Sequence, residues 1–184
     1  MKIETTKEIG FCFGVKRAIG ILEKVARERG GVETLGAVVH NQQVLQRLAE
    51  INVRLVQGVN DIQGDVVAIS SHGVSPQVEE EIRARHIDIV NTTCPFVHRI
   101  QIAARRLAEA GFFVIIYGDA DHTEVKSVLG WAGGKGLATL DEKFITQLNP
   151  LPRRLGILSQ TTQIPAHFTE FVKRLIDSAF TKDS

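Results

Sequence analysis

The sequence contains little of what marks several protein classes. Only two of its 184 residues are cysteine, and neither belongs to a CxxC pair, which excludes a disulfide framework and a zinc ribbon. No apolar run approaches the roughly 20 residues that a membrane-spanning helix needs. The first five residues lack the apolar core of a signal peptide. The formal net charge of +1 gives no basic excess for binding nucleic acid. We therefore expect a globular protein that works in the cytoplasm with reduced thiols.

What the chain does contain is a regular alternation of strand and helix patterns. Short apolar runs alternate with helical apolar spacing, which is typical of an α/β fold with small, mainly parallel sheets. We expect two tandem α/β units, residues 1–94 and residues 95–184, with an N-terminal strand and the first cysteine loop in residues 1–12. The expected strands are residues 3–5, 32–39, 53–56, 66–69, 87–90, 112–117, 137–140 and 155–158, and a weak helix is expected near 141–148.

Each cysteine stands directly before a predicted helix. Cys94 follows the β-branched run 87–90 and precedes Pro95, a residue suited to the first turn of a helix. Cys12 lies between Gly10 and Gly14, which allow a tight turn and the close approach of a ligand. The positive end of a helix dipole favours the thiolate, the form that binds metals and attacks electrophiles. The alternative for either residue is a small buried side chain.

Polar or soft residues end five of the predicted strands. In open parallel sheets, ligands bind beyond the carboxyl ends of the strands, so we expect these residues to converge. Helix N-termini with histidines suit a phosphate or diphosphate, and two cysteines at the same level suit a soft metal or an iron–sulfur cluster. A single histidine at a strand end is more often a capping residue. The residues are His40, His72, Cys94, His122 with Glu124, and Thr161 with Thr162.

Six motifs, in this order and covering nearly the whole chain, resemble the 4-hydroxy-3-methylbut-2-enyl diphosphate reductase family (IspH/LytB). The motifs are residues 10–15 (GFCFGV), 38–41 (VVHN), 71–75 (SHGVS), 92–95 (TTCP), 122–125 (HTEV) and 160–162 (QTT). The resemblance implies the last step of the methylerythritol phosphate route to isoprenoids. In that step a hydroxyl group is removed from an allylic diphosphate with two electrons and two protons, which gives isopentenyl and dimethylallyl diphosphates.

The resemblance also implies a cofactor and an electron donor. The family uses a [4Fe-4S] cluster held by three cysteines, and by motif Cys12 and Cys94 are two of these ligands. A ferredoxin or flavodoxin is the expected electron donor. We expect neither nucleic acid nor membrane as a partner.

The same resemblance implies roles for five further residues. His40, His72 and His122 are expected to hold the diphosphate. Glu124 is expected to supply protons to the substrate, which requires a carboxyl group within hydrogen-bond reach. Thr161 is expected to orient this proton relay.

The chain departs from the family pattern in length. The family has a trefoil-like architecture of three α/β units, and the third unit carries the third cysteine, whereas these residues match the first two units and contain no third cysteine. We therefore expect an incomplete reductase that, expressed alone, has little activity and binds iron poorly. A smaller departure is Ser127, which stands where the family usually has glycine.

Two other functions are compatible with the same residues. One is a transferase or hydrolase that uses Cys94 as its nucleophile and His72 or His122 as the base. The other is a diphosphate-binding module without redox activity. A reductase predicts an oxygen-sensitive brown protein. A transferase or hydrolase predicts rapid alkylation of one cysteine, with loss of activity, in metal-free buffer. The module predicts diphosphate binding that is unaffected by Cys94→Ser.

Overall fold

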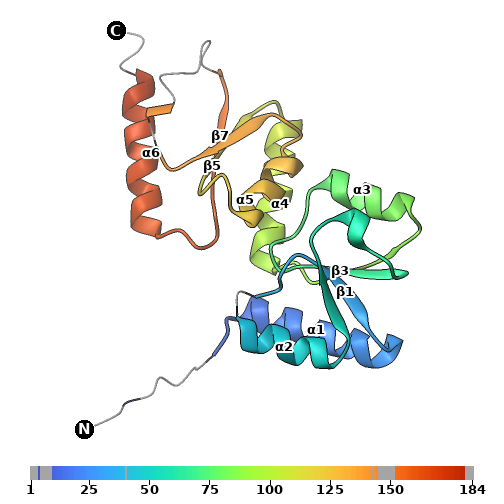
Figure 1. Cartoon of the computed structure of the whole chain (residues 1–184). Coiled ribbons are helices and arrows are strands. Elements are labelled where there is room, and N and C mark those ends of the chain that lie inside the picture. Colours follow the sequence, from blue (N-terminus) through green and yellow to red (C-terminus); the bar gives the residue numbers. More distant parts are fainter. Residues whose placement is uncertain (1–3, 5–9, 40, 142, 145–151, 181–184) are drawn as a thin grey trace. The chain divides into compact units, whose positions relative to one another are not determined.

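The chain forms two compact units, each with one sheet of parallel strands. The computed structural model describes residue 4 and residues 10–39, 41–141, 143–144 and 152–180. One unit comprises Met1–Ser71 with Ile87–Cys94, and the other comprises His72–His86 with Pro95–Ser184. All strand pairs in both sheets are parallel. The predicted α/β fold with small parallel sheets is thereby confirmed (Figure 1).

The division at residue 94 coincides with one border between the units, but residues 72–86 belong with the second unit rather than the first. The loop before α3 (Pro76–Ala84) packs on the end of α5 (Thr123–Trp131). The Trp131 indole N–H donates to the Val74 carbonyl at 2.9 Å. Gly130 allows the close approach, since a Cβ there would lie 2.2 Å from the Ser75 Cβ. These contacts explain why α3 groups with α5.

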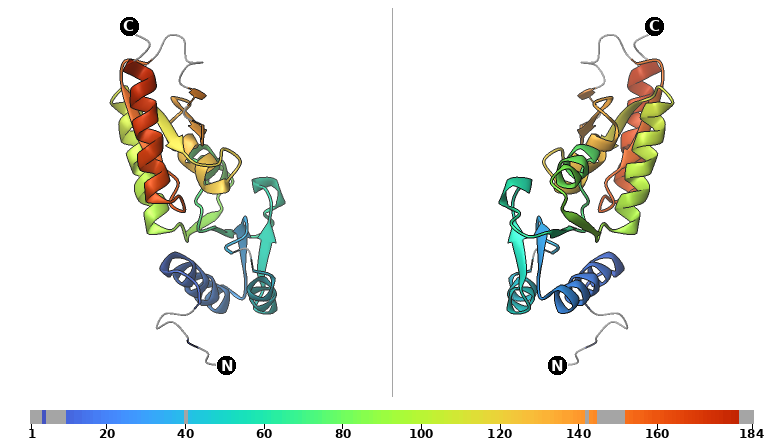
Figure 2. Two further views of the ribbon diagram at one scale, coloured as in Figure 1. Left: turned by 90° about the vertical axis from the view of Figure 1, so that its left-hand side faces the viewer. Right: turned by 90° about the vertical axis from the view of Figure 1, so that its right-hand side faces the viewer.

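The first unit is a four-stranded sheet with two helices packed against it. The strand order is β2-β1-β3-β4, formed by Val53–Val56, Val32–Leu35, Val66–Ile69 and Asp88–Asn91. Helices α1 (Phe13–Arg29) and α2 (Gln42–Glu50) lie side by side against the sheet in Figures 1 and 2. A short 3-10 helix, η1 (Val59–Asp61), follows β2. The core between helices and sheet includes Ala18, Leu22, Val44, Leu48, Val53, Val66 and Ala68.

The second unit is a three-stranded sheet covered on both faces. The strand order is β6-β5-β7, formed by Gly136–Thr139, Phe113–Tyr117 and Leu155–Ser159. Alternate residues of β5 face α4 (Pro95–Glu109) with α5 on one side and α6 (Pro165–Phe180) on the other, so β5 is buried on both faces. Figure 1 shows α6 on one side of β5 and β7 and α4 on the other. This explains why residues 112–117 read as a continuous apolar run.

Most predicted elements are found, with shifted ends. The strands predicted at 53–56 and 66–69 have the predicted bounds. The strand predicted at 32–39 ends at Leu35, because Gly36 adopts a left-handed φ of 78° and turns the chain. The strand at 3–5 and the helix near 141–148 fall mainly outside the described residues. Within the described part of the chain, no helix has the length and apolar character needed to cross a membrane.

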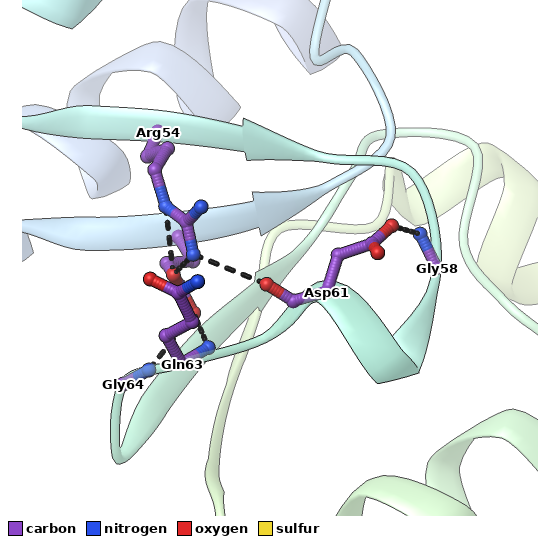
Figure 3. Close-up of polar contacts among 6 residues, drawn as sticks. Arg54, Gly58, Asp61, Gln63 and Gly64 are labelled. Atoms are coloured by element: carbon purple, nitrogen blue, oxygen red, sulfur yellow. Dashed lines mark hydrogen bonds and ion pairs between the residues drawn. The ribbon is translucent and has the colours of Figure 1, made fainter.

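At the amino ends of the strands in the first unit, a buried carboxylate joins three segments. Glu33 is 8% exposed. One of its oxygens accepts hydrogen bonds from the Arg54 guanidinium, including one of 2.9 Å from Nε. The other accepts from the backbone N–H groups of Gln63 at 2.9 Å and Gly64 at 3.1 Å. Figure 3 shows Arg54 above this loop, where it also donates to the Asp61 carbonyl.

Burial alone would raise the pKa of Glu33, but the hydrogen bonds from Arg54 and from two backbone N–H groups, with the charge of Arg54, lower the pKa below its ordinary value. Because the folded-state pKa lies below that of the unfolded chain, this carboxylate stabilises the fold above about pH 4.3, the ordinary pKa of glutamate. The stabilisation is lost as pH falls through the lowered pKa.

We therefore expect Glu33→Gln to lower the free energy of unfolding at neutral pH by about 1–3 kcal/mol. Both Glu33 oxygens accept hydrogen bonds, and the NH₂ group of glutamine cannot accept those of the oxygen that it replaces. Urea denaturation monitored by circular dichroism measures this difference. The gap between wild type and variant should narrow as pH falls below about 4. Glu50→Gln, an exposed change on α2, is the control and should leave stability unaltered. A stability difference between wild type and Glu33→Gln that widens below about pH 4 would contradict the lowered pKa of Glu33.

Candidate functional site

Cys12 lies at the amino end of α1, whose first-turn N–H groups have no capping side chain. It occupies the N-cap position in an extended conformation, its side chain makes no capping hydrogen bond, and the first turn contains no acidic residue. The first helical hydrogen bond runs from the Lys16 N–H to the Cys12 carbonyl at 3.0 Å. The N–H groups of the preceding turn therefore remain available to an anionic acceptor. The Cys12 thiol is free and exposed.

Cys94 is held against the end of β3 by its own backbone and that of the residues before it. The Cys94 N–H donates to the Ser71 carbonyl at 2.9 Å. The Thr92 N–H and hydroxyl both donate to the Ile69 carbonyl. The Thr93 N–H donates to the Asn91 side chain at 2.9 Å, closing a local turn. The free, half-buried Cys94 thiol thus extends from a rigid backbone.

Gly14 brings the two cysteines to the same end of α1. A Cβ built at Gly14 would lie only 2.7 Å from the Cys94 sulfur, so this sulfur rests on the backbone of the first turn of α1. Cys12 is the residue at which this turn begins. Two thiols at an uncapped helix N-terminus suit thiolate ligands of a soft metal. Among the described residues, however, no group of three or more Cys, His, Asp or Glu side chains could hold a metal ion. The pair therefore fits as part of a ligand set and not as a whole one.

In the second unit, His72 and His122 form a pair of imidazole rings. Their centroids are 5.4 Å apart and their planes meet at 81°. His122 is the N-cap of α5, and its Nδ1 accepts the Glu124 N–H at 3.2 Å. An accepting Nδ1 is unprotonated, so the proton of neutral His122 lies on Nε2. That nitrogen is therefore a donor, suited to an anionic oxygen.

Glu124 is buried and bound through both oxygens to one residue. It is 2% exposed. One oxygen accepts the Thr161 N–H and the other accepts the Thr161 hydroxyl, both at 2.7 Å. Thr161 follows β7, and the preceding Gln160 fixes the end of β5 by accepting the Asp119 N–H at 3.1 Å. A carboxylate and a hydroxyl joined in this way form a two-member hydrogen-bond chain that can hold or pass a proton.

The structure brings the predicted residues together within each unit. Cys94 packs against the first turn of α1, which begins at Cys12, His72 contacts His122, and Glu124 binds Thr161. Thr162 is exposed, and His40 lies outside the described residues.

Sequence reasoning missed two positions. Arg17 donates to the Thr93 carbonyl at 3.2 Å. The buried Gln101 amide donates to the Ser127 hydroxyl at 2.7 Å, which gives the serine at this position a partner on α4. Both contacts join residues far apart in the chain, for which no local pattern exists.

The sequence model of the LytB protein family matches residues 3–182. This chain belongs to the LytB family. A LytB relative from Dehalococcoides mccartyi strain CBDB1, named 4-hydroxy-3-methylbut-2-enyl diphosphate reductase, is 60% identical over 184 residues, covering all of this chain and 65% of the relative. A protein of the same name from Geobacter metallireducens is 38% identical over 163 residues. The chain thus spans 65% of the Dehalococcoides relative and 57% of the Geobacter relative, less than two thirds of each.

Solved structures agree with the LytB assignment. The reductase structure from Plasmodium falciparum superposes with a TM-score of 0.86 at 26% identity, covering 92% of this chain and 54% of that one. A second structure, of (E)-4-hydroxy-3-methyl-but-2-enyl diphosphate reductase, gives a TM-score of 0.79 at 38% identity, covering 91% of this chain and 60% of that one. These matches extend over both α/β units.

We expect Thr161→Val to lower the free energy of unfolding by about 1–3 kcal/mol, because the buried Glu124 carboxylate loses a hydroxyl donor. Thr161→Ser keeps this donor and should retain most of the stability. Thr162→Val, at the neighbouring exposed position, is the control. Urea denaturation of the four proteins measures the series. Equal losses for Thr161→Ser and Thr161→Val would contradict the role given to the hydroxyl.

Proposed function

We propose that this chain forms part of a reductase that removes the hydroxyl group of 4-hydroxy-3-methylbut-2-enyl diphosphate and yields isopentenyl and dimethylallyl diphosphates. The observation that supports this most directly is the constellation of His122, Glu124 and Thr161. An imidazole donor suited to an anion lies two residues from a buried carboxylate that is bound to a hydroxyl. This combination joins anion binding with proton delivery, which an allylic diphosphate reduction requires.

The histidines are proposed to bind the diphosphate. The rings of His72 and His122 are in edge contact within one unit, and His122 keeps Nε2 as a donor while Nδ1 caps α5. We assign His40 to the same task from its motif. Hydrogen bonds from imidazole to phosphate oxygens are charge-assisted and therefore stronger than neutral ones. Binding energy at the diphosphate, remote from the hydroxyl that leaves, holds the substrate for the reaction.

Glu124 and Thr161 are proposed to supply protons. Two electrons and two protons enter the reaction, one C–O bond breaks, the hydroxyl leaves as water and a C–H bond forms. Thr161 binds the Glu124 carboxylate through both its N–H and its hydroxyl, so the orientation of the carboxylate is fixed before substrate arrives. A fixed donor of this kind is the arrangement that general acid catalysis favours.

Cys12 and Cys94 are proposed to be two ligands of a [4Fe-4S] cluster, which supplies the two electrons when bound. Cys12 is the N-cap of α1 and the Cys94 sulfur rests on the first turn of this helix, where uncapped N–H groups favour anionic sulfur. The family resemblance implies three thiolates, and this sequence contains two cysteines. The reductase therefore needs a third thiolate from outside these 184 residues. Reducing equivalents are proposed to come from a ferredoxin or flavodoxin.

Binding of the diphosphate is the first test. Titration calorimetry of the metal-free chain with 4-hydroxy-3-methylbut-2-enyl diphosphate should give an affinity that falls about tenfold or more in His72→Ala and in His122→Ala, since each variant loses a hydrogen bond to a charged group worth about 1.5–3 kcal/mol. His98→Ala, an exposed change on α4, is the matched control. Affinity that is equal in all four proteins would contradict the proposed diphosphate site.

Turnover is the second test. The 184-residue chain, purified and reconstituted without oxygen, should retain iron poorly and show little turnover with a strong reductant, because two thiolates are too few for the cluster. The Dehalococcoides relative, treated in parallel, is the assay control. A stable cluster with turnover in the 184-residue chain would contradict the need for a third thiolate. If diphosphate binds to the chain and no reduction is seen even when a thiolate-bearing segment of the relative is supplied, a binding module is the better description.

A further inference from the structure

Arg17 connects the helix that begins at Cys12 with the segment that ends at Cys94. It lies on α1, one turn after Phe13, and its side chain is half-buried. Its guanidinium Nη1 donates to the Thr93 carbonyl at 3.2 Å, although 76 positions separate the two residues in the chain. Thr93 is the residue directly before Cys94, so the contact acts on the backbone that carries the second thiol.

Two contacts of different kinds therefore fix the Cys94 sulfur relative to α1. Gly14 limits how closely the sulfur approaches, because its backbone forms the surface on which the sulfur rests. Arg17 holds the segment against that surface by a charge-assisted hydrogen bond. The other hydrogen bonds of this segment run to the end of β3 or within the segment itself. Among the described residues, Arg17 is the side chain that ties the segment to α1.

We propose that Arg17 is a positioning residue for the Cys12–Cys94 thiol pair: it fixes the separation of the two sulfurs and places a permanent positive charge beside them. The inference rests on the proposed function, in which both sulfurs are ligands of one group. Arginine suits this position because its guanidinium stays protonated when half-buried and has several donors in a rigid plane. The charge also favours an anionic sulfur-rich ligand set over a neutral one.

Cadmium ion is the probe for this inference, because it binds thiolates, needs no redox chemistry and gives an ultraviolet charge-transfer band. The metal-free 184-residue chain should bind one Cd²⁺ through both thiols, so that Cys12→Ser and Cys94→Ser each reduce the band. Arg17→Met keeps the packing of the aliphatic stem and removes the donor and the charge. We expect Arg17→Met to weaken Cd²⁺ binding about tenfold, and Arg17→Lys, which keeps the charge and N–H donors but loses the rigid planar guanidinium, to weaken it less.

Arg27→Met is the matched control. Arg27 lies on the same helix, is exposed, and donates to the Glu23 carbonyl four residues earlier, far along α1 from the cysteines. It should leave Cd²⁺ affinity unchanged. Urea denaturation of both methionine variants shows whether a loss of binding merely follows a loss of stability.

A second measurement keeps the inference testable if Arg17→Met fails to fold. The rate of alkylation by iodoacetamide is measured for each cysteine by mass spectrometry in wild type and in Arg17→Lys. Cys12 is exposed and serves as the internal reference for half-buried Cys94. A looser Cys94 segment should raise the Cys94-to-Cys12 rate ratio severalfold.

The outcomes separate the two proposals. If wild type binds Cd²⁺ no better than the single-cysteine variants, the thiol pair of the proposed function fails and this inference fails with it. If wild type uses both thiols and neither Arg17 variant changes the affinity or the alkylation ratio, the positioning role of Arg17 alone is overturned.

Discussion

The sulfur of Cys94 occupies the volume that any side chain at position 14 would need, and the candidate chemistry of the first unit depends on this packing. Cys94 follows the carboxyl end of β4, and the first turn of α1, which begins at Cys12, packs against the Cys94 sulfur. Glycine alone allows the backbone of α1 to meet the sulfur there. The first turn of α1 has no capping side chain and no acidic residue, and Gly14 has no β-carbon. Its N–H groups are therefore accessible to thiolate ligands.

In the second unit, the carboxyl ends of parallel strands carry a histidine, a carboxylate and a hydroxyl instead of two thiols. His122 is the N-cap of α5 and a candidate ligand-binding group, and the second residue of α5, Glu124, is a buried carboxylate. The loop after β7 supplies the hydroxyl that binds this carboxylate. Because β5 and β7 are neighbouring parallel strands, their carboxyl ends deliver these groups to one edge. Sheet topology accounts for the meeting of Glu124 and Thr161.

The strands and the residues at their carboxyl ends can be predicted from the sequence. The side-chain contacts between distant segments cannot, for a physical reason. Apolar period and glycine placement predict the strands, and the carboxyl-end rule predicts that residues such as His122 and Thr161 approach their partners. Arg17 and Gln101 could not be predicted, because each contact joins distant segments and an arginine or glutamine on a helix is ordinarily solvated. The attachment of residues 72–86 to the second unit also depends on a distant partner, Trp131.

His122 is both the N-cap of α5 and a proposed ligand of the diphosphate. Its Nδ1 accepts the Glu124 N–H, which leaves Nε2 of the neutral ring as the donor. An anion that accepts from Nε2 polarises the ring and makes Nδ1 a better acceptor, since linked hydrogen bonds reinforce one another. By thermodynamic reciprocity, a firmly capped α5 in turn binds the anion more tightly. In the proposed function, diphosphate binding at His122 is therefore coupled to the capping of α5.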